Sequence, residues 1–356
     1  MALLQKISRP RVRILGTDYS SRIVGLHNRF RAHAQRLLVY KDISRFPRAV
    51  AARARGLFVA GSPRHVVYLR RGAPESTVAH ELIHALLCTE GFLPLRCRTD
   101  DLARHPEIAS LAESLSDLLV HPIVLARLQR YGFAPAPDVP GAAGPASSRR
   151  PKPVPRHGPD LPPPPANARA ALRLLARAVA AAEARHRAAA GRAGQQPAFA
   201  PGSRAFEKIV DAIAAMAPWD PDRRALDARV RAAAILRYLE ETALARWGIH
   251  PALPERILVP PYLTPGRLDA PASRLFDVRV AGAEGDLVLV VFRIDGAACS
   301  ARSYADPERA GKVTDAVRRE IGSMTAAQFI ERHRLEYILI ERHGRCRPGA
   351  GGRPRI

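Results

Sequence analysis

The chain has few cysteines and no long apolar run, and each shortage excludes a class of protein. Its four cysteines are scattered over 356 residues, so they form neither a disulfide framework nor the paired spacing of a zinc ribbon. No uninterrupted apolar stretch has the length of a membrane span, and the first ten residues lack the apolar core and cleavage site of a signal peptide. We therefore expect a cytoplasmic protein with no membrane partner.

Several chemical signatures are also missing. The sequence has no phosphate-binding loop, no serine nucleophile elbow and no internal repeat. It is 47% apolar and 25% charged, which is typical of a globular protein, and its length suffices for two domains.

The most informative stretch is His80-Glu81-Leu82-Ile83-His84. On a helix, His80 and His84 lie one turn apart on one face and can bind one metal ion, while Glu81 can reach a water molecule at that metal. Pro74 and Gly91 suit the start and the end of such a helix, and residues 65–70 look like a strand that leads into it. The pattern predicts a Zn²⁺ hydrolase. The alternative is an amphipathic helix with two half-buried histidines and no metal.

A catalytic zinc takes three protein ligands, so a third must come from another segment. The best candidate is Glu113, on a periodic apolar segment that follows His105 and Pro106, and Asp117 lies four residues later on the same face. This Glu-x-x-x-Asp pair after H-E-x-x-H resembles the third-ligand helix of the gluzincin zinc metallopeptidases. The resemblance implies that Glu113 binds the zinc and that Asp117 orients a ligand histidine, His80, by accepting its other ring N–H.

The resemblance covers about residues 55–133, and within it the chain is similar to the ImmA/IrrE-like stand-alone peptidases. Those peptidases cleave or relieve transcriptional repressors after DNA damage or mobile-element induction. The resemblance implies a stress-linked protease whose substrate is a specific intracellular protein, such as a co-encoded repressor. A metzincin is excluded, because residues 88–90 offer no glycine or third histidine at the required spacing.

In the expected mechanism, Glu81 is the general base that takes a proton from water and passes it to the leaving amine. Three residues are candidates for stabilising the oxyanion, and the sequence does not choose among His105, His121 and Tyr131. Cys97 is a candidate regulatory thiol that would occupy the water position on zinc in a latent state; the alternative is an inert loop thiol.

The basic charge is concentrated at the start of the chain. Residues 1–71 contain 16 Lys and Arg but two acids, whereas residues 72–133 contain five basic and eight acidic residues. This segregation indicates an acidic or polyanionic partner. We expect single-stranded DNA or RNA to bind and to raise activity, through Arg22, Arg29, Arg31, Arg36 and Arg64. Because only five of the 56 basic residues are lysine, genome composition is the alternative explanation.

The composition also predicts an α+β protein in several parts. Residues 1–133 form a small zincin-like domain, with a short sheet, the H-E-x-x-H helix and the third-ligand helix. Residues 134–165 contain 12 of the 32 prolines and form a linker. Residues 166–342 form a helical segment followed by a small α+β domain, and residues 343–356 a basic disordered tail. We expect helices over 21–38, 166–190, 204–216, 221–247 and 307–322, and strands over 11–16, 57–60, 276–280, 286–292, 299–304 and 337–340.

Residues 166–356 show no recognisable chemistry and suit a sensor, a docking domain or an oligomerisation domain. Two other functions remain open for the whole chain. One is a nucleic-acid-binding regulatory protein without catalysis. The other is a proteolytically silent zincin that acts as an interaction module.

Overall fold

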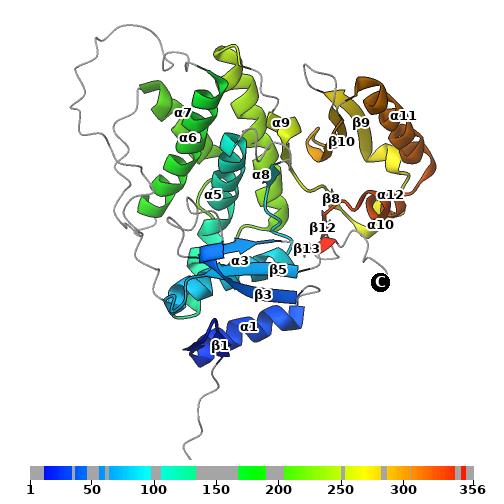
Figure 1. Cartoon of the computed structure of the whole chain (residues 1–356). Coiled ribbons are helices and arrows are strands. Elements are labelled where there is room, and N and C mark those ends of the chain that lie inside the picture. Colours follow the sequence, from blue (N-terminus) through cyan, green and yellow to red (C-terminus); the bar gives the residue numbers. More distant parts are fainter. Residues whose placement is uncertain are drawn as a thin grey trace, which may run out of the picture. The chain divides into compact units, whose positions relative to one another are not determined.

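The structure is a computed structural model of the whole chain (Figure 1). It describes residues 12–33, 37–45, 56–60, 64–97, 106–133, 167–189, 204–249, 253–281, 287–304, 306–340 and 346–349. These residues form an α+β structure with several small sheets. The chain divides into two compact units: residues 1–90 with 123–137, and residues 91–122 with 138–356. The division into domains at residues 133 and 166 stays a prediction.

The first unit is built on a three-stranded sheet of order β3–β5–β4. Strand β3 (Leu37–Asp42) is parallel to β5 (Arg64–Leu69), and β4 (Gly56–Val59) is antiparallel to it. A β1–β2 hairpin (Val12–Ile14 and Thr17–Tyr19) precedes helix α1 (Ser21–His33). A short 3₁₀ turn, Ile43–Arg45, follows β3.

Helix α3 (Glu75–Thr89) lies against α1, β4 and β5. Pro74 precedes its first turn, and Gly91 adopts a positive φ of 93° just beyond its end, a conformation that glycine adopts without strain. Glu75 in its first turn accepts hydrogen bonds from the backbone N–H and the hydroxyl of Ser20, at 2.7 and 2.9 Å. These contacts fix the start of α3 against the start of α1. The bounds of α3 confirm the helix predicted between Pro74 and Gly91, and those of β5 confirm the strand predicted over residues 65–70.

Helix α5 (Pro106–Arg130) runs without a break through Pro122. Proline removes one backbone hydrogen bond, but Leu119 and Ile123 on either side of it are buried, and this packing keeps the helix intact. By length and composition α5 is apolar enough to cross a membrane, and half of its most apolar window is buried inside the structure.

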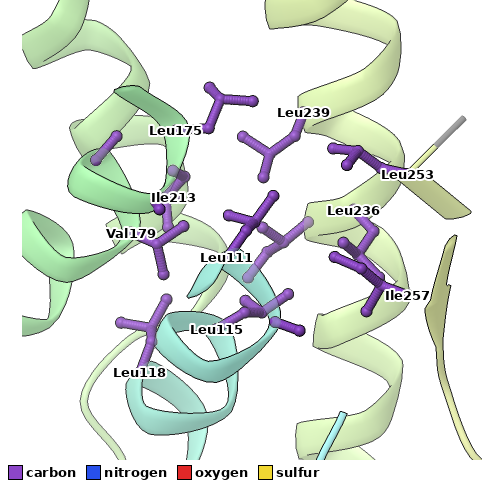
Figure 2. Packing of buried hydrophobic residues seen from close by; sticks show 14 of the residues in the cluster. Leu111, Leu115, Leu118, Leu175, Val179, Ile213, Leu236, Leu239, Leu253 and Ile257 are labelled. Atoms are coloured by element: carbon purple, nitrogen blue, oxygen red, sulfur yellow. The ribbon is translucent and has the colours of Figure 1, made fainter. Parts of the chain in front are cut away.

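The core of the second unit forms where the first part of α5 packs with the later helices. These are α6 (Ala168–Ala189), α7 (Arg204–Met216) and α8 (Ala225–Tyr238), the last continued by a π-helical segment, Leu239–Leu244. Figure 2 shows buried apolar side chains of these helices, together with Leu253 and Ile257 from the segment that follows them, meeting around α5. They include Leu111, Leu115, Leu118, Leu175, Val179, Ile213, Leu236, Leu239, Leu253 and Ile257.

The end of the chain forms small sheets with two helices. Strands β9 (Phe276–Ala281), β10 (Leu287–Phe292) and β11 (Ala298–Ser303) make an antiparallel sheet that α11 (Pro307–Ser323) covers. Helix α12 (Ala326–His333), absent from the prediction, leads into β12 (Tyr337–Ile340). β12 pairs with β8 (Tyr262–Leu263) and β13 (Cys346–Gly349). The remaining short elements are β6 (Arg96–Cys97), β7 (Ile257–Leu258), α9 (Leu253–Arg256), α10 (Pro265–Leu268) and a 3₁₀ turn, Ala272–Arg274.

Candidate metal centre

Helix α3 is buried along most of its length, and the positions it leaves open are histidines. From Thr77 to Cys88 every residue is buried except His80 and His84, which are half-buried. Their Nε2 atoms lie 3.1 Å apart. Two nitrogens of a tetrahedral zinc site, each about 2.0–2.1 Å from the ion, lie about 3.3 Å from each other. The pair therefore has the separation that one shared metal ion requires.

His121 of helix α5 completes a group of three. The ligand atoms of His80, His84 and His121 all lie within 4.8 Å of one another. Among the residues that the structure describes, this is the one group of three or more His, Cys, Asp or Glu side chains that meets this criterion. Three histidines are an established ligand set for catalytic zinc, and imidazole also suits copper, nickel and iron.

An ion pair ties helix α3 to the end of α5. Arg127 donates to both carboxylate oxygens of Glu90, each at 2.6 Å. Glu90 directly follows α3, and Arg127 follows His121 by six residues on one continuous helix. A bidentate pair of this kind fixes orientation as well as distance, so the two helices that carry the histidines are tied together.

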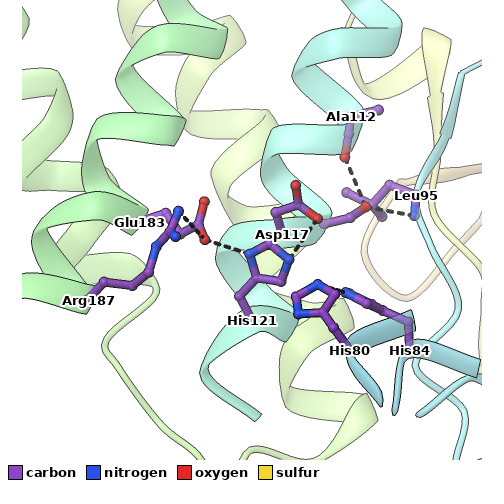
Figure 3. A network of polar contacts seen from close by, with 9 residues as sticks. His80, His84, Leu95, Ala112, Asp117, His121, Glu183 and Arg187 are labelled. Atoms are coloured by element: carbon purple, nitrogen blue, oxygen red, sulfur yellow. Dashed lines mark hydrogen bonds and ion pairs between the residues drawn. The ribbon is translucent and has the colours of Figure 1, made fainter. Parts of the chain in front are cut away.

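The ring of His121 lies between two carboxylates (Figure 3). Its Nδ1 atom is 2.6 Å from Oε1 of Glu183 on helix α6, and its Nε2 atom is 3.5 Å from Oδ1 of Asp117. Arg187 contacts the same Glu183 oxygen at 3.1 Å. Burial opposes a positive charge on His121, but Asp117 and Glu183 outweigh it and raise its pKa. For the Asp117 carboxyl, burial disfavours the negative charge and raises the pKa.

The predicted general base, Glu81, is buried, with 7% of its surface exposed. Its side chain lies against the backbone of Gly56, the first residue of β4. A Cβ atom at Gly56 would lie 2.8 Å from Cγ and 2.9 Å from Oε1 of Glu81. The absence of a side chain at Gly56 is what makes room for this carboxylate, next in sequence to the ligand His80.

No protein-family model, curated protein or solved structure matches this chain. The three histidines are consistent with an H-E-x-x-H-type zinc site on their own geometry.

The two acidic residues predicted to serve the zinc site, Glu113 and Asp117, have other surroundings in the structure than the sequence predicted. Glu113 is an exposed residue of α5 and is not a member of the three-histidine group. Its role as a zinc ligand stays a prediction, in competition with His121. Asp117 was predicted to orient His80, whereas the contact seen in the structure is with His121.

Two of the three candidates for stabilising the oxyanion can be placed. His121 belongs to the three-histidine group, while the hydroxyl of Tyr131 accepts a hydrogen bond from Arg29 at 3.2 Å. His105 lies outside the described residues. Cys97 is a free cysteine in β6, where it pairs with Ile257 of β7, and it is not part of the metal group. Its regulatory role stays a prediction.

The arginines predicted to bind nucleic acid are partly used in contacts within the protein. Arg22 donates to the carbonyl of Gly132 at 2.7 Å, and Arg29 lies over the Tyr131 ring, 5.2 Å from its centroid. Arg31 and Arg64 are exposed, and Arg36 lies outside the described residues. The binding of a polyanion by these arginines stays a prediction.

The sequence reasoning missed Glu183 altogether. A signal was present, because Leu175, Val179 and Glu183 follow one another at intervals of four on helix α6, and the first two belong to its buried face. A carboxylate in such a row is expected to be buried, and a buried carboxylate needs a partner.

Proposed function

We propose that this chain is a zinc-dependent peptidase in which His80, His84 and His121 hold the metal and Glu81 is the general base. One observation carries the proposal. Between Thr77 and Cys88 the residues of helix α3 that are not buried are two histidines with Nε2 atoms 3.1 Å apart, and a third imidazole lies within 4.8 Å.

The chemistry of these residues fits a hydrolytic zinc. Three imidazoles leave the fourth tetrahedral position for water or substrate. When bound, zinc acts as a Lewis acid that lowers the pKa of water to about 7 and polarises a carbonyl group. Glu81 takes the proton of the attacking water and delivers it to the leaving amine nitrogen. The nearby carboxylates of Asp117 and Glu183 offset the charge of a divalent ion.

The peptide substrate is proposed from the resemblance of H-E-x-x-H and Glu-x-x-x-Asp to the gluzincins and to the ImmA/IrrE-like peptidases. A histidine as third ligand would depart from the glutamate of the gluzincins. On the same basis we propose a specific intracellular protein as substrate, such as a co-encoded repressor, and a cytoplasmic location. Stimulation by single-stranded DNA or RNA rests on the basic charge of residues 1–71 alone. Binding of an oligonucleotide that weakens steeply with salt tests it.

Zinc content and peptide cleavage, measured on three proteins, test the proposal. The wild type is expected to contain one zinc ion per chain and to cleave a quenched fluorescent peptide library. Glu81→Gln is expected to retain the zinc and lose the cleavage, because the amide cannot accept the proton. His80→Ala is expected to lose both.

The other functions predict different results for the same proteins. A silent zincin contains zinc but cleaves nothing, and a nucleic-acid-binding protein contains substoichiometric zinc. Full cleavage by Glu81→Gln would remove the proposed mechanism.

A further inference from the structure

We infer that Glu183 of helix α6 is a positioning residue for the metal centre. It accepts the hydrogen bond of Nδ1–H of His121 and thereby turns Nε2 of that histidine toward the metal. This inference rests on the proposed function, since it requires a metal at His121.

The contact has the properties of a strong, specific hydrogen bond. Nδ1 and Oε1 are 2.6 Å apart, slightly shorter than the about 2.7–2.9 Å that is usual for N–H···O hydrogen bonds between charged groups. Glu183 is only 6% exposed, and burial of an unpaired carboxylate would be strongly destabilising. Arg187, one turn later on α6, contacts the same oxygen at 3.1 Å and is a second partner for the carboxylate.

This hydrogen bond selects the ring nitrogen that can bind a metal. A neutral imidazole has one N–H donor and one nitrogen with a lone pair, and the partner of one nitrogen determines the role of the other. With Nδ1–H donated to Glu183, Nε2 is the nitrogen available as ligand. Asp117 lies on the Nε2 side at 3.5 Å, beyond the usual hydrogen-bond distance, so it does not fix the ring in the same way.

The position of Glu183 gives residues 166–189 a function. Helix α6 follows the proline-rich stretch 134–165, yet its buried face packs on α5 next to His121. A second ion pair, between the buried Glu107 of α5 and the exposed Arg173 of α6 at 2.8 Å, joins the same two helices. Helix α6 therefore supports the metal ligand from outside the segment that carries H-E-x-x-H.

The Glu107–Arg173 pair provides a matched control. Glu107 is 5% exposed and joins α5 to α6 as Glu183 does, but it lies 14 residues before His121 on the same helix, or about 21 Å along the axis. Glu107→Gln thus removes a buried charge from the same helix pair without touching His121.

The test is a competition titration of the metal-free full-length chain with Zn²⁺ and a chromophoric chelator, with thermal unfolding of each metal-free variant alongside. Glu183→Ala is expected to weaken zinc binding by about 10–100-fold, the range for loss of an outer hydrogen-bonding partner. Glu183→Gln is expected at the lower end of that range, because its amide oxygen still accepts from Nδ1–H. Cobalt-substituted protein should show an altered visible spectrum for the Glu183 variants. Glu107→Gln should leave both metal affinity and spectrum unchanged, since distant sites act independently.

Each outcome decides the inference. Wild-type affinity in both Glu183 variants would overturn it, as would an equal loss in Glu107→Gln, which would show that helix pairing alone matters. If Glu183→Ala fails to fold, the isosteric Glu183→Gln decides. A wild-type chain that binds no zinc would remove the proposed function as well, whereas zinc binding that ignores Glu183 would remove this inference only.

Discussion

Substituting Gly56 by alanine should displace the proposed general base while sparing the metal site. The new Cβ would stand 2.8 Å from Cγ and 3.1 Å from Cδ of Glu81, whereas carbon atoms in contact lie about 3.5–4.0 Å apart. The Glu81 side chain must therefore move by roughly 0.7 Å or more. A misplacement of about 1 Å can lower a rate by about 100-fold, so we expect a loss of 10- to 100-fold in kcat, by the same reasoning.

The stability and the zinc content of Gly56→Ala should change little, because the three atoms nearest the new Cβ all belong to the Glu81 side chain and none to the backbone. Gly25→Ala in α1 is the matched control: a Cβ there meets nothing within 4 Å, and alanine favours the helix by about 1 kcal/mol. The assay compares kcat for a fluorogenic peptide, zinc content and Tm for both variants. Wild-type kcat in a folded, zinc-loaded Gly56→Ala protein would refute the placement of Glu81 as the base.

Three further predictions concern the fold. Leu111→Ala removes a side chain that is 0% exposed and should lower the free energy of unfolding by about 2–5 kcal/mol. Urea denaturation measures this loss, and a loss well below that range would contradict the packing around α5. Burial opposes the charge of Glu107, but a backbone hydrogen bond and Arg173 outweigh it and hold its pKa below the ordinary 4.5. Its stabilising contribution is therefore complete above pH 4.5 and lost as pH falls through the folded pKa, so Glu107→Gln should flatten the acid side of the stability curve. An unchanged curve would show that the pair with Arg173 does not form. Thr325→Ala breaks a capping box in which Thr325 and Gln328 make hydrogen bonds of 3.0 and 3.3 Å. The substitution should lower the free energy of unfolding by about 1 kcal/mol. Thermal unfolding measures this loss, and an unchanged Tm would contradict the cap.

Elements with strong local signals were predicted well from the sequence. Helix α3 has a proline before its first turn and a glycine after its end, and β10 is a continuous apolar run rich in valine. The end of α1 was predicted wrongly. The helix ends at His33 rather than at residue 38, and residues 37–42 form β3. Pairing of β3 with β5 is a long-range interaction, and local periodicity does not report it.

The candidate site divides in the same way. His80, Glu81 and His84 follow from spacing on one helix, which is local geometry. The third ligand depends on which face of α5 meets α3. Glu113, Asp117 and His121 share one face of α5 at intervals of four residues, so the pattern alone does not choose among them. The burial of Glu183 could be inferred from its spacing on α6, but its pairing with His121 depends on how a helix from beyond the proline-rich stretch packs on α5, which no sequence spacing reveals.

Zinc binding by His121→Ala and Glu113→Gln tests the central claim most directly. Both full-length chains would be titrated with Zn²⁺ against a chromophoric chelator, beside the wild type. We predict that Glu113→Gln keeps one tightly bound zinc per chain, and that His121→Ala loses more affinity than the about 10–100-fold typical of an outer partner. The opposite order, with zinc retained in His121→Ala and lost in Glu113→Gln, would contradict the three-histidine centre.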